Sequence, residues 1–218
     1  MRDNMRLEYG RHGYEEGGRV ARMSEAHMAG RRGQIARAAV AEFSRRGIHS
    51  TSMANIIEAS GLSAGAIYTH FAGKDEIIAH VARSAIDTVL DGVRDLAAAD
   101  APPDPDQVIG LIAERVAAGE VPAGLIAQCW GEAATNPQVR GTANEVYGRA
   151  LAMLREYAVN WLAGSRGLSR TAAEDLAPSL ARALLSLVYS QILHDAVIDA
   201  ERGEGLARDV ARLIAAVG

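Results

Sequence analysis

Apolar residues recur at helical spacing along most of the chain from Gln34 onward. Ile35, Ala39 and Phe43 stand four residues apart, which places them on one face of a helix. No segment alternates apolar and polar residues as a half-buried strand would. The helical segments are separated by glycines, prolines and residues that cap helix ends. The pattern therefore predicts an all-α fold.

The predicted helices form three regions. Residues 1–29 lack apolar periodicity and are predicted to be a disordered tail. Residues 30–73 hold three short helices: one from Gln34 that Gly47 closes, one capped by Thr51 or Ser52, and one capped by Ser63. Residues 74–218 begin with a linker helix of about 25 residues, roughly 38 Å long. A bundle of five helical segments follows it, over residues 106–118, 122–135, 139–163, 171–199 and 205–217.

Charge is unevenly distributed along the 218 residues, although the net charge is only −4. Residues 31–80 carry a balance of +2, and residues 81–218 carry −6. A mildly basic head on an acidic body is consistent with nucleic acid approached from one end. Cys129 is the only cysteine, so an intrachain disulfide is excluded. We find no apolar run near the length of a membrane span and no apolar secretory signal, and we expect a cytoplasmic protein that does not bind membranes.

Residues 51–74 form the most informative stretch, because they read as helix, glycine corner, helix. In a helix-turn-helix unit the second helix enters the DNA major groove with its N-terminal end first. Ser63, Ala64 and Gly65 are small enough to bring the backbone close to base edges. Tyr68, Thr69 and His70 come one turn later, where phosphate oxygens would lie. The other candidate phosphate contacts are Arg31, Arg32 and Lys74.

This stretch and the helix before it resemble the TetR family of bacterial one-component regulators. The matching residues are Ile35, Ala38, Ala39, Phe43, Gly47, Thr51, Ser52, Met53, Ile56, Gly61, Leu62, Ser63, Gly65, Ile67, Tyr68, His70, Phe71 and Lys74. The resemblance implies a homodimer that binds a palindromic double-stranded DNA operator and is released by a small-molecule effector. It also implies phosphate contacts for Thr51, Ser52, Tyr68, Thr69, His70 and Lys74, and base-proximal positions for Ser63, Ala64 and Gly65.

Each candidate contact also has a structural interpretation. Thr51 and Ser52 can act as helix caps whether or not they touch DNA. His70 can be a packing histidine, and Phe71 is expected in the core. Ala64 stands where the family often has a longer polar or basic residue. Direct base reading is therefore expected to be sparse, with DNA shape contributing more to sequence preference.

The bundle is expected to hold the effector and to join two copies. Candidates to line an effector pocket are Gln128, Trp130, Tyr147, Met153, Tyr157, Trp161, Tyr189, Gln191 and His194, although each aromatic among them can equally fill the core. The resemblance implies that the last two helices pair across the dimer. Apolar stripes there comprise Leu180, Leu184, Leu187, Val188, Leu206, Val210 and Leu213, which can instead be core of one copy.

Three functions remain open on the sequence alone. The first is a repressor that leaves its operator when it binds a largely apolar ligand. The second is a DNA-binding regulator without a small-molecule switch, controlled by its abundance or by a protein partner. The third, an enzyme or carrier, is least favoured, because no catalytic triad order, metal-ligand spacing or cofactor motif is present.

Overall fold

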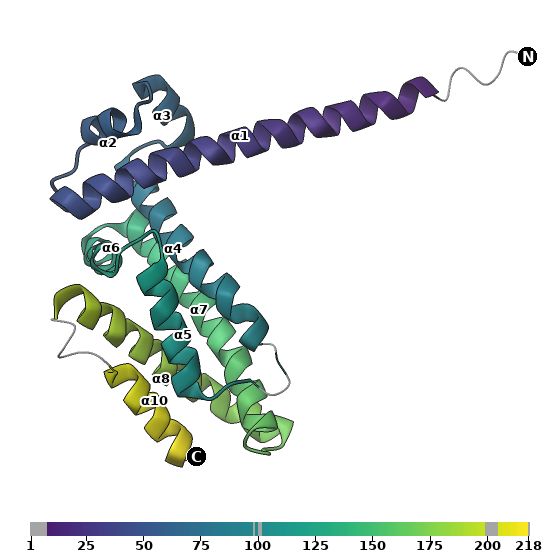
Figure 1. The fold of residues 1–218 in the computed structure, drawn as a ribbon, viewed down its shortest axis with the longest axis vertical. Coiled ribbons are helices and arrows are strands. Elements are labelled where there is room, and N and C mark those ends of the chain that lie inside the picture. The colour runs from purple at the N-terminus through teal and green to yellow at the C-terminus, as the bar shows by residue number, and fades with distance from the viewer. Residues whose placement is uncertain (1–7, 98, 100–101, 199–204, 218) are drawn as a thin grey trace, which may run out of the picture.

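The computed structural model describes residues 8–97, 99, 102–198 and 205–217. Within these ranges all regular structure is helical, which confirms the predicted all-α fold. In chain order the helices are α1 (Glu8–Arg46), α2 (Met53–Ser60), α3 (Ala64–His70), α4 (Lys74–Ala97), α5 (Pro105–Ala118), α6 (Ala123–Thr135), α7 (Pro137–Gly164), α8 (Arg170–Val197) and α10 (Leu206–Val217). Figure 1 shows α1–α3 as a head at one end and the later helices as an elongated body, with α4 leading from one to the other.

Local sequence signals explain the short helices of the head. Gly47 and Gly61 follow α1 and α2 with φ angles of 81° and 67°, a left-handed conformation that favours glycine. Ser52 caps α2: its Oγ accepts from the Asn55 N–H, and Asn55 Oδ1 accepts from the Ser52 N–H. Ser63 caps α3 by accepting from the Ala66 N–H. These ends lie where the sequence predicts them, because capping depends on residues only a few positions apart.

The first helix differs from its prediction. The sequence predicts a disordered tail over residues 1–29, whereas α1 begins at Glu8 and projects from the head in Figure 1. The expectation rested on missing apolar periodicity. That periodicity reports packing against a core, and a helix that extends away from the body needs no apolar stripe. Residues 1–7 lie outside the described part.

The head does not have a core of its own. Ile35 and Phe43 of α1, Ile56 of α2 and Ile67 of α3 are fully buried in one apolar cluster. Leu125, Cys129 and Ala133 of α6 and Val139 of α7 belong to that same cluster. The predicted boundary at residues 73 and 74 thus marks where α4 begins, but packing continues across it from the head into α6.

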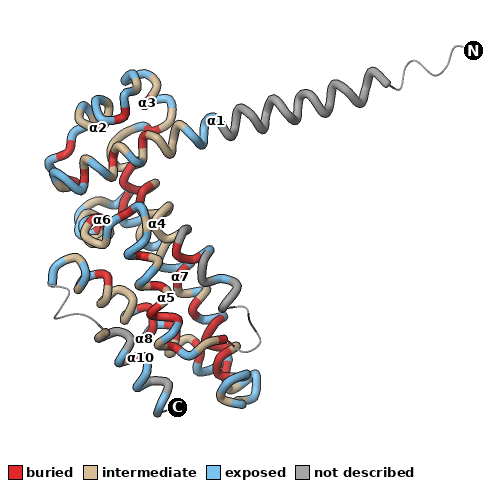
Figure 2. Tube along the Cα trace, in the orientation of Figure 1, coloured by how far each residue is buried: buried red, intermediate tan, exposed pale blue. Residues whose placement is uncertain are grey.

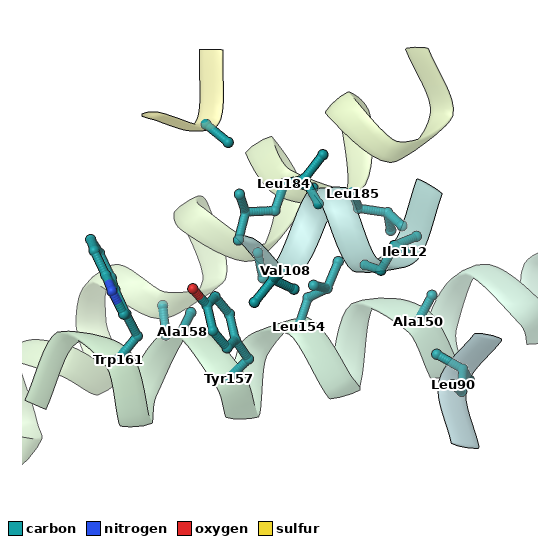
Figure 3. Packing of buried hydrophobic residues seen from close by; sticks show 14 of the residues in the cluster. Leu90, Val108, Ile112, Ala150, Leu154, Tyr157, Ala158, Trp161, Leu184 and Leu185 are labelled. Atoms are coloured by element: carbon teal, nitrogen blue, oxygen red, sulfur yellow. The ribbon is translucent and has the colours of Figure 1, made fainter. Parts of the chain in front are cut away.

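The second apolar cluster fills the body between α4, α5, α7, α8 and α10. Figure 3 shows Leu154 and Tyr157 pointing from α7 toward Val108 of α5 and Leu184 of α8. Figure 2 shows that buried positions follow the inner faces of these helices. Polar contacts also join α4 to α7: Arg83 Nε lies 3.0 Å from Glu145 Oε2, and Arg149 pairs with Asp87.

Helix α8 is more apolar than expected, because the sequence analysis found no apolar run near the length of a membrane span. Among the described helices it alone is long and apolar enough, by length and composition, to cross a membrane. It packs against α5, α6, α7 and α10 within the body. A helix shared by so many neighbours needs apolar residues on several faces.

Candidate nucleic-acid interface and apolar cavity

The third helix presents one face to the core and the other to solvent. Ile67 is fully buried, and Phe71 at the end of α3 is 1% exposed, so the expectation that Phe71 belongs to the core is confirmed. Ser63, Ala64, Gly65 and Thr69 are exposed. The outward face of α3 is therefore a row of small side chains followed by larger hydroxyl-bearing ones.

Packing within the chain does not account for the character of this outward face. A Cβ atom added at Gly65 would meet no other atom within 4 Å. Glycine costs about 1 kcal/mol relative to alanine inside a helix. Tyr68 is 52% exposed, although its ring is large and partly apolar. A partner surface in close contact with α3 would require both the open space at Gly65 and the exposed ring of Tyr68.

The hydroxyl residues predicted to touch phosphate fall into two groups. Ser52 and Thr69 are exposed, with Thr69 Oγ1 donating to the Gly65 carbonyl at 2.9 Å. Thr51 is only 1% exposed, and its Oγ1 donates to the Gly47 carbonyl at 2.8 Å. The prediction of a phosphate contact by the Thr51 side chain is therefore wrong, because that hydroxyl closes the connection between α1 and α2.

Two of the predicted cations are engaged within the chain. Lys74 Nζ donates to the backbone carbonyls of Ile48 and Thr51, at 3.0 and 3.2 Å. Arg32 Nη1 donates to the His70 carbonyl at 2.7 Å, and its guanidinium lies 4.2 Å from the centre of the Phe71 ring. Both side chains fasten parts of the head together. The sequence reading missed these roles because their partners are distant in the chain.

The other two candidates near the DNA-facing side are less constrained. Arg31 Nη1 donates to Gln34 Oε1 at 3.0 Å, a contact one helical turn away. His70 is half-buried, and its Nδ1 has no hydrogen-bond partner within the described part of the chain.

A backbone N–H at Ala72 donates to Glu76 at 2.7 Å and, with Arg32, lowers the pKa of that carboxyl group. The Glu76 carboxylate thus stabilises the start of α4.

The body contains an apolar cavity walled by α4, α5, α6, α7 and α8. Its enclosed space is about 80 Å³, and the whole hollow, including its open mouth, is about 880 Å³. The lining is aliphatic except for Cys129, Trp130, Met153 and Tyr189. No charged side chain lines it. Such a cavity suits an apolar ligand, whose few polar groups would meet the tyrosine hydroxyl, the indole N–H or the thiol.

Only three of the predicted pocket residues line this cavity: Trp130, Met153 and Tyr189. The Trp130 and Tyr189 rings meet edge to face with centres 4.0 Å apart, and exposed Tyr147 stacks on Tyr189 at 6.0 Å. The aliphatic positions of α4 and α7, such as Ile86 and Val146, were missed. Their apolar spacing was visible in the sequence, but it does not distinguish a cavity wall from core.

The remaining predicted pocket residues have other positions. Tyr157 is fully buried and donates to the Pro103 carbonyl at 2.7 Å, and Trp161 Nε1 donates to Asp104 Oδ1 at 3.0 Å. Both anchor the segment before α5. Gln128 points to the head instead, where its Oε1 accepts from the Ile48 N–H at 3.0 Å. Gln191 donates to Asp195, and His194 is half-buried on α8. These residues are not lining positions of the cavity.

Burial sets the chemistry of the polar groups in the cavity. Desolvation, assisted by the Glu132 charge, raises the pKa of the Cys129 thiol to about 12. Desolvation beside Tyr147 raises the pKa of Tyr189 to about 12. Both groups are therefore neutral near pH 7, and the thiol is a poor nucleophile. The cavity offers neutral hydrogen-bonding groups rather than charges.

A second hollow, of about 400 Å³, lies between α1, α4 and the segment before α6. Its floor includes Val40 and Val81, and Arg37, His80 and Glu120 also line it. This hollow is more polar than the cavity in the body. Within the described residues no group of three His, Cys, Asp or Glu side chains is placed to hold a metal ion.

The residues predicted to form a dimer interface differ in their exposure. Leu184 is fully buried within the chain, so its assignment to an interface is wrong: it has no surface left to offer. Leu180, Leu187, Val188 and Val210 are half-buried, and Leu213 is 63% exposed. The side chain of Leu206 lies outside the described part. The sequence reading missed three apolar residues exposed at the end of α8 and just beyond it: Leu193, Val197 and Ile198.

Comparison with known proteins connects this geometry to a family. The family model described as bacterial regulatory proteins, tetR family, matches residues 35–81. The HTH-type transcriptional repressor KstR2 of Mycobacterium tuberculosis is 33% identical over 73 residues, 34% of this chain and 36% of that protein. The HTH-type transcriptional regulator PksA of Bacillus subtilis is 33% identical over 90 residues, 41% of this chain and 43% of that protein. The matches thus span less than half the length of these curated relatives.

Solved structures resemble the fold over most of the chain. Salmonella enterica GusR superposes with a TM-score of 0.66 at 23% identity, covering 86% of this chain and 94% of that one. The TetR family transcriptional regulator PfmR of Thermus thermophilus superposes with a TM-score of 0.55 at 20% identity, covering 84% and 95%. At these identities the similarity shows that the helices are arranged alike, and it shows nothing about function.

Proposed function

This chain belongs to the TetR family of bacterial regulatory proteins, and on that premise we propose that it is a DNA-binding transcriptional regulator. The observation that carries the proposal is the outward face of α3. Its first residues are small and exposed, space is open at Gly65, and Tyr68 is exposed at 52%. These features serve an α-helix that enters a major groove.

The proposed contacts follow from which side chains are free to reach DNA. Ser63, Ala64 and Gly65 lie at the base edges, and Tyr68 and Thr69 contact phosphate oxygens one turn later. Ser52, exposed at the start of α2, and Arg31 provide further phosphate contacts. Lys74 and Arg32 keep their positive charges beside the interface while their hydrogen bonds hold the head together.

We further propose that the chain acts as a homodimer in the cytoplasm, with one head on each half of a palindromic operator. Two heads must lie about 34–36 Å apart to occupy successive major grooves. Leu193, Val197 and Ile198 give α8 an exposed apolar end that a second copy would cover. Repression is the favoured direction of control, because KstR2 is by its name a repressor.

The effector in this proposal is small and largely apolar, because the cavity in the body is apolar. Its enclosed space of about 80 Å³ is small, whereas typical ligand pockets hold ~300 Å³ or more. A larger ligand would have to displace wall side chains, and that displacement would give it different affinities for two conformations. The small enclosed space also favours the second candidate, a regulator without a small-molecule switch.

Selection of duplexes from a random pool tests the proposed activity, followed by anisotropy titrations at several salt concentrations. A regulator should select a sequence with two-fold symmetry, and its affinity should fall steeply as salt rises. Tyr68→Ala should weaken binding, whereas Tyr147→Ala, which removes an exposed tyrosine from the body, should not. An enzyme or carrier would show no salt-dependent duplex binding, and that result would end the proposal.

The effector is tested separately on the selected duplex. A panel of small apolar compounds should contain one that lowers duplex affinity, and Ala143→Phe, which fills the cavity, should prevent its action. If a compound still acts on that variant, its site lies elsewhere, and the hollow beside Arg37 and His80 becomes the next location to test. If no compound acts, the regulator without a switch is favoured.

A further inference from the structure

One residue in the connection between α1 and α2, Ile48, is held from two sides. The Ile48 N–H donates to Gln128 Oε1 of α6 at 3.0 Å, and the Ile48 carbonyl accepts from Lys74 Nζ of α4 at 3.0 Å. Ile48 itself is 3% exposed and packs in the cluster shared by the head and α6. Its backbone is therefore bonded at both ends to helices that continue into the body.

The segment around Ile48 is also closed internally. The Thr51 hydroxyl donates to the Gly47 carbonyl, and the Thr51 carbonyl accepts a second bond from Lys74 at 3.2 Å. His49 Nδ1 lies 3.5 Å from Glu132 Oε2, one turn beyond Gln128 on α6. Ser52 caps α2 directly after this segment. Few backbone bonds between Ile48 and α2 are therefore free to rotate, so a shift of Ile48 would displace α2.

The two helices that hold Ile48 also wall the apolar cavity. On α6, Gln128 is followed by Cys129 and Trp130, which both line the cavity. On α4, the cavity is lined by Ala82, Ile86 and Leu90, which follow Lys74 along the middle of the helix. Each helix thus meets the cavity with one set of side chains and Ile48 with another.

We propose that Gln128 is a positioning residue that couples the conformation of the cavity wall to the position of the DNA-binding head. The inference rests on the proposed function. A helix moves as a rigid unit, and a hydrogen bond weakens steeply when its distance or angle departs from the optimum. A displacement of Trp130 therefore changes the Gln128–Ile48 bond, and with it the balance between two positions of the head. If the cavity wall and the head are coupled in this way, DNA binding changes the surroundings of Trp130 in turn.

Fluorine NMR on the full chain labelled with 5-fluorotryptophan tests this reciprocal effect. The chain has two tryptophans, so Trp161, buried in the core of the body, is an internal reference. On saturation with the selected duplex, the Trp130 resonance should shift more than that of Trp161. Gln128→Ala should still bind the duplex but lose the Trp130 shift, and Gln128→Glu, which keeps an acceptor oxygen, should restore it.

Gln138→Ala is the matched control, because Gln138 is an exposed glutamine on the neighbouring α7; it should keep the full shift. Circular dichroism checks that Gln128→Ala folds, because this change removes the acceptor of the Ile48 N–H. A full Trp130 shift in Gln128→Ala, or no shift in the unmodified chain with duplex bound, overturns the inference. Failure to find any duplex would instead overturn the proposed function, so the two failures are distinguishable.

Discussion

Arg32 donates through Nη1 to the carbonyl oxygen of His70 at 2.7 Å, so the first helix holds the last residue of α3. The same guanidinium lies over the Phe71 ring and 3.4 Å from Glu76 Oε1. One side chain of α1 thus binds the end of α3, the residue after it and the first turn of α4. The orientation of the proposed recognition helix depends on this arginine.

Removing the guanidinium should destabilise the head. Arg32→Ala should lower the free energy of unfolding by about 1–3 kcal/mol, because a charge-assisted hydrogen bond and a ring contact are lost together. Arg32→Lys should restore little, since a lysine ammonium cannot reproduce the planar arrangement. Urea unfolding measures both. Arg31→Ala is the control, because Arg31 donates to Gln34 in the same helix, and an equal loss in both variants would contradict the assignment.

Substitutions at Gly65 should change stability and DNA affinity in opposite directions. Gly65→Ala should raise stability by roughly 0.5–1 kcal/mol, because an added Cβ meets no atom within 4 Å and alanine favours the helix. Gly65→Leu should weaken duplex binding by about tenfold or more, equal to ~1.4 kcal/mol, because its side chain holds the helix away from the bases. If Gly65→Leu binds the selected duplex normally, α3 does not approach DNA at this position.

Two threonines of the head offer a matched comparison. Thr51→Val should cost about 1–2 kcal/mol of stability, because a buried hydroxyl loses its bond and leaves the Gly47 carbonyl unsatisfied. Thr69→Val should leave stability nearly unchanged and weaken duplex binding, since Thr69 is exposed on α3. Thermal unfolding and anisotropy titrations distinguish the two, and the reverse pattern would show that their roles are exchanged.

The stability of the chain should depend on pH through His80. Burial, and then the charges of Arg32 and Arg83, lower the pKa of His80 below the ordinary histidine value of 6.5, against the opposing effect of Glu76 and Asp87. The unfolded chain therefore binds the proton more readily than the folded one. The contribution is fully present above about pH 6.5 and is lost as the pH falls toward the lower folded pKa.

The measurement compares urea unfolding of the unmodified chain and His80→Gln across this window. The unmodified chain should lose more stability between about pH 7 and pH 5.5, because only it takes up this proton on unfolding. Other titrating groups are common to both chains and cancel in the difference. Parallel curves would show that His80 has no lowered pKa.

The exposed end of α8 should control self-association. Leu193→Glu, with or without Val197→Glu, should convert a dimer into monomers, because a charge cannot be buried in an apolar interface without a partner. Sedimentation velocity measures the mass. Leu176→Glu is the control: this leucine is also exposed, but it lies about 100° around the helix from Leu193 at 100° per residue. Monomers from the control alone would place the interface on the other face.

The sequence by itself determined the all-α class and most helix ends, because the signals involved are local. Ser52 and Ser63 cap helices by bonding residues three positions on, and Gly47 and Gly61 adopt left-handed backbone where the helices end. The position of Ile67 and Phe71 in the core also follows from spacing along one short helix. Such features need only a few neighbouring residues.

Only the tertiary structure decided which polar side chains are free to meet a partner. Arg32 and His70 are 38 positions apart, and Ile48 and Gln128 are 80 apart, so no spacing rule connects them. Helical periodicity likewise places Trp130 and Tyr157 on inward faces, but packing alone makes one a cavity wall and the other buried core. A side chain's local pattern shows which way it points, whereas its role depends on what the rest of the fold brings against it.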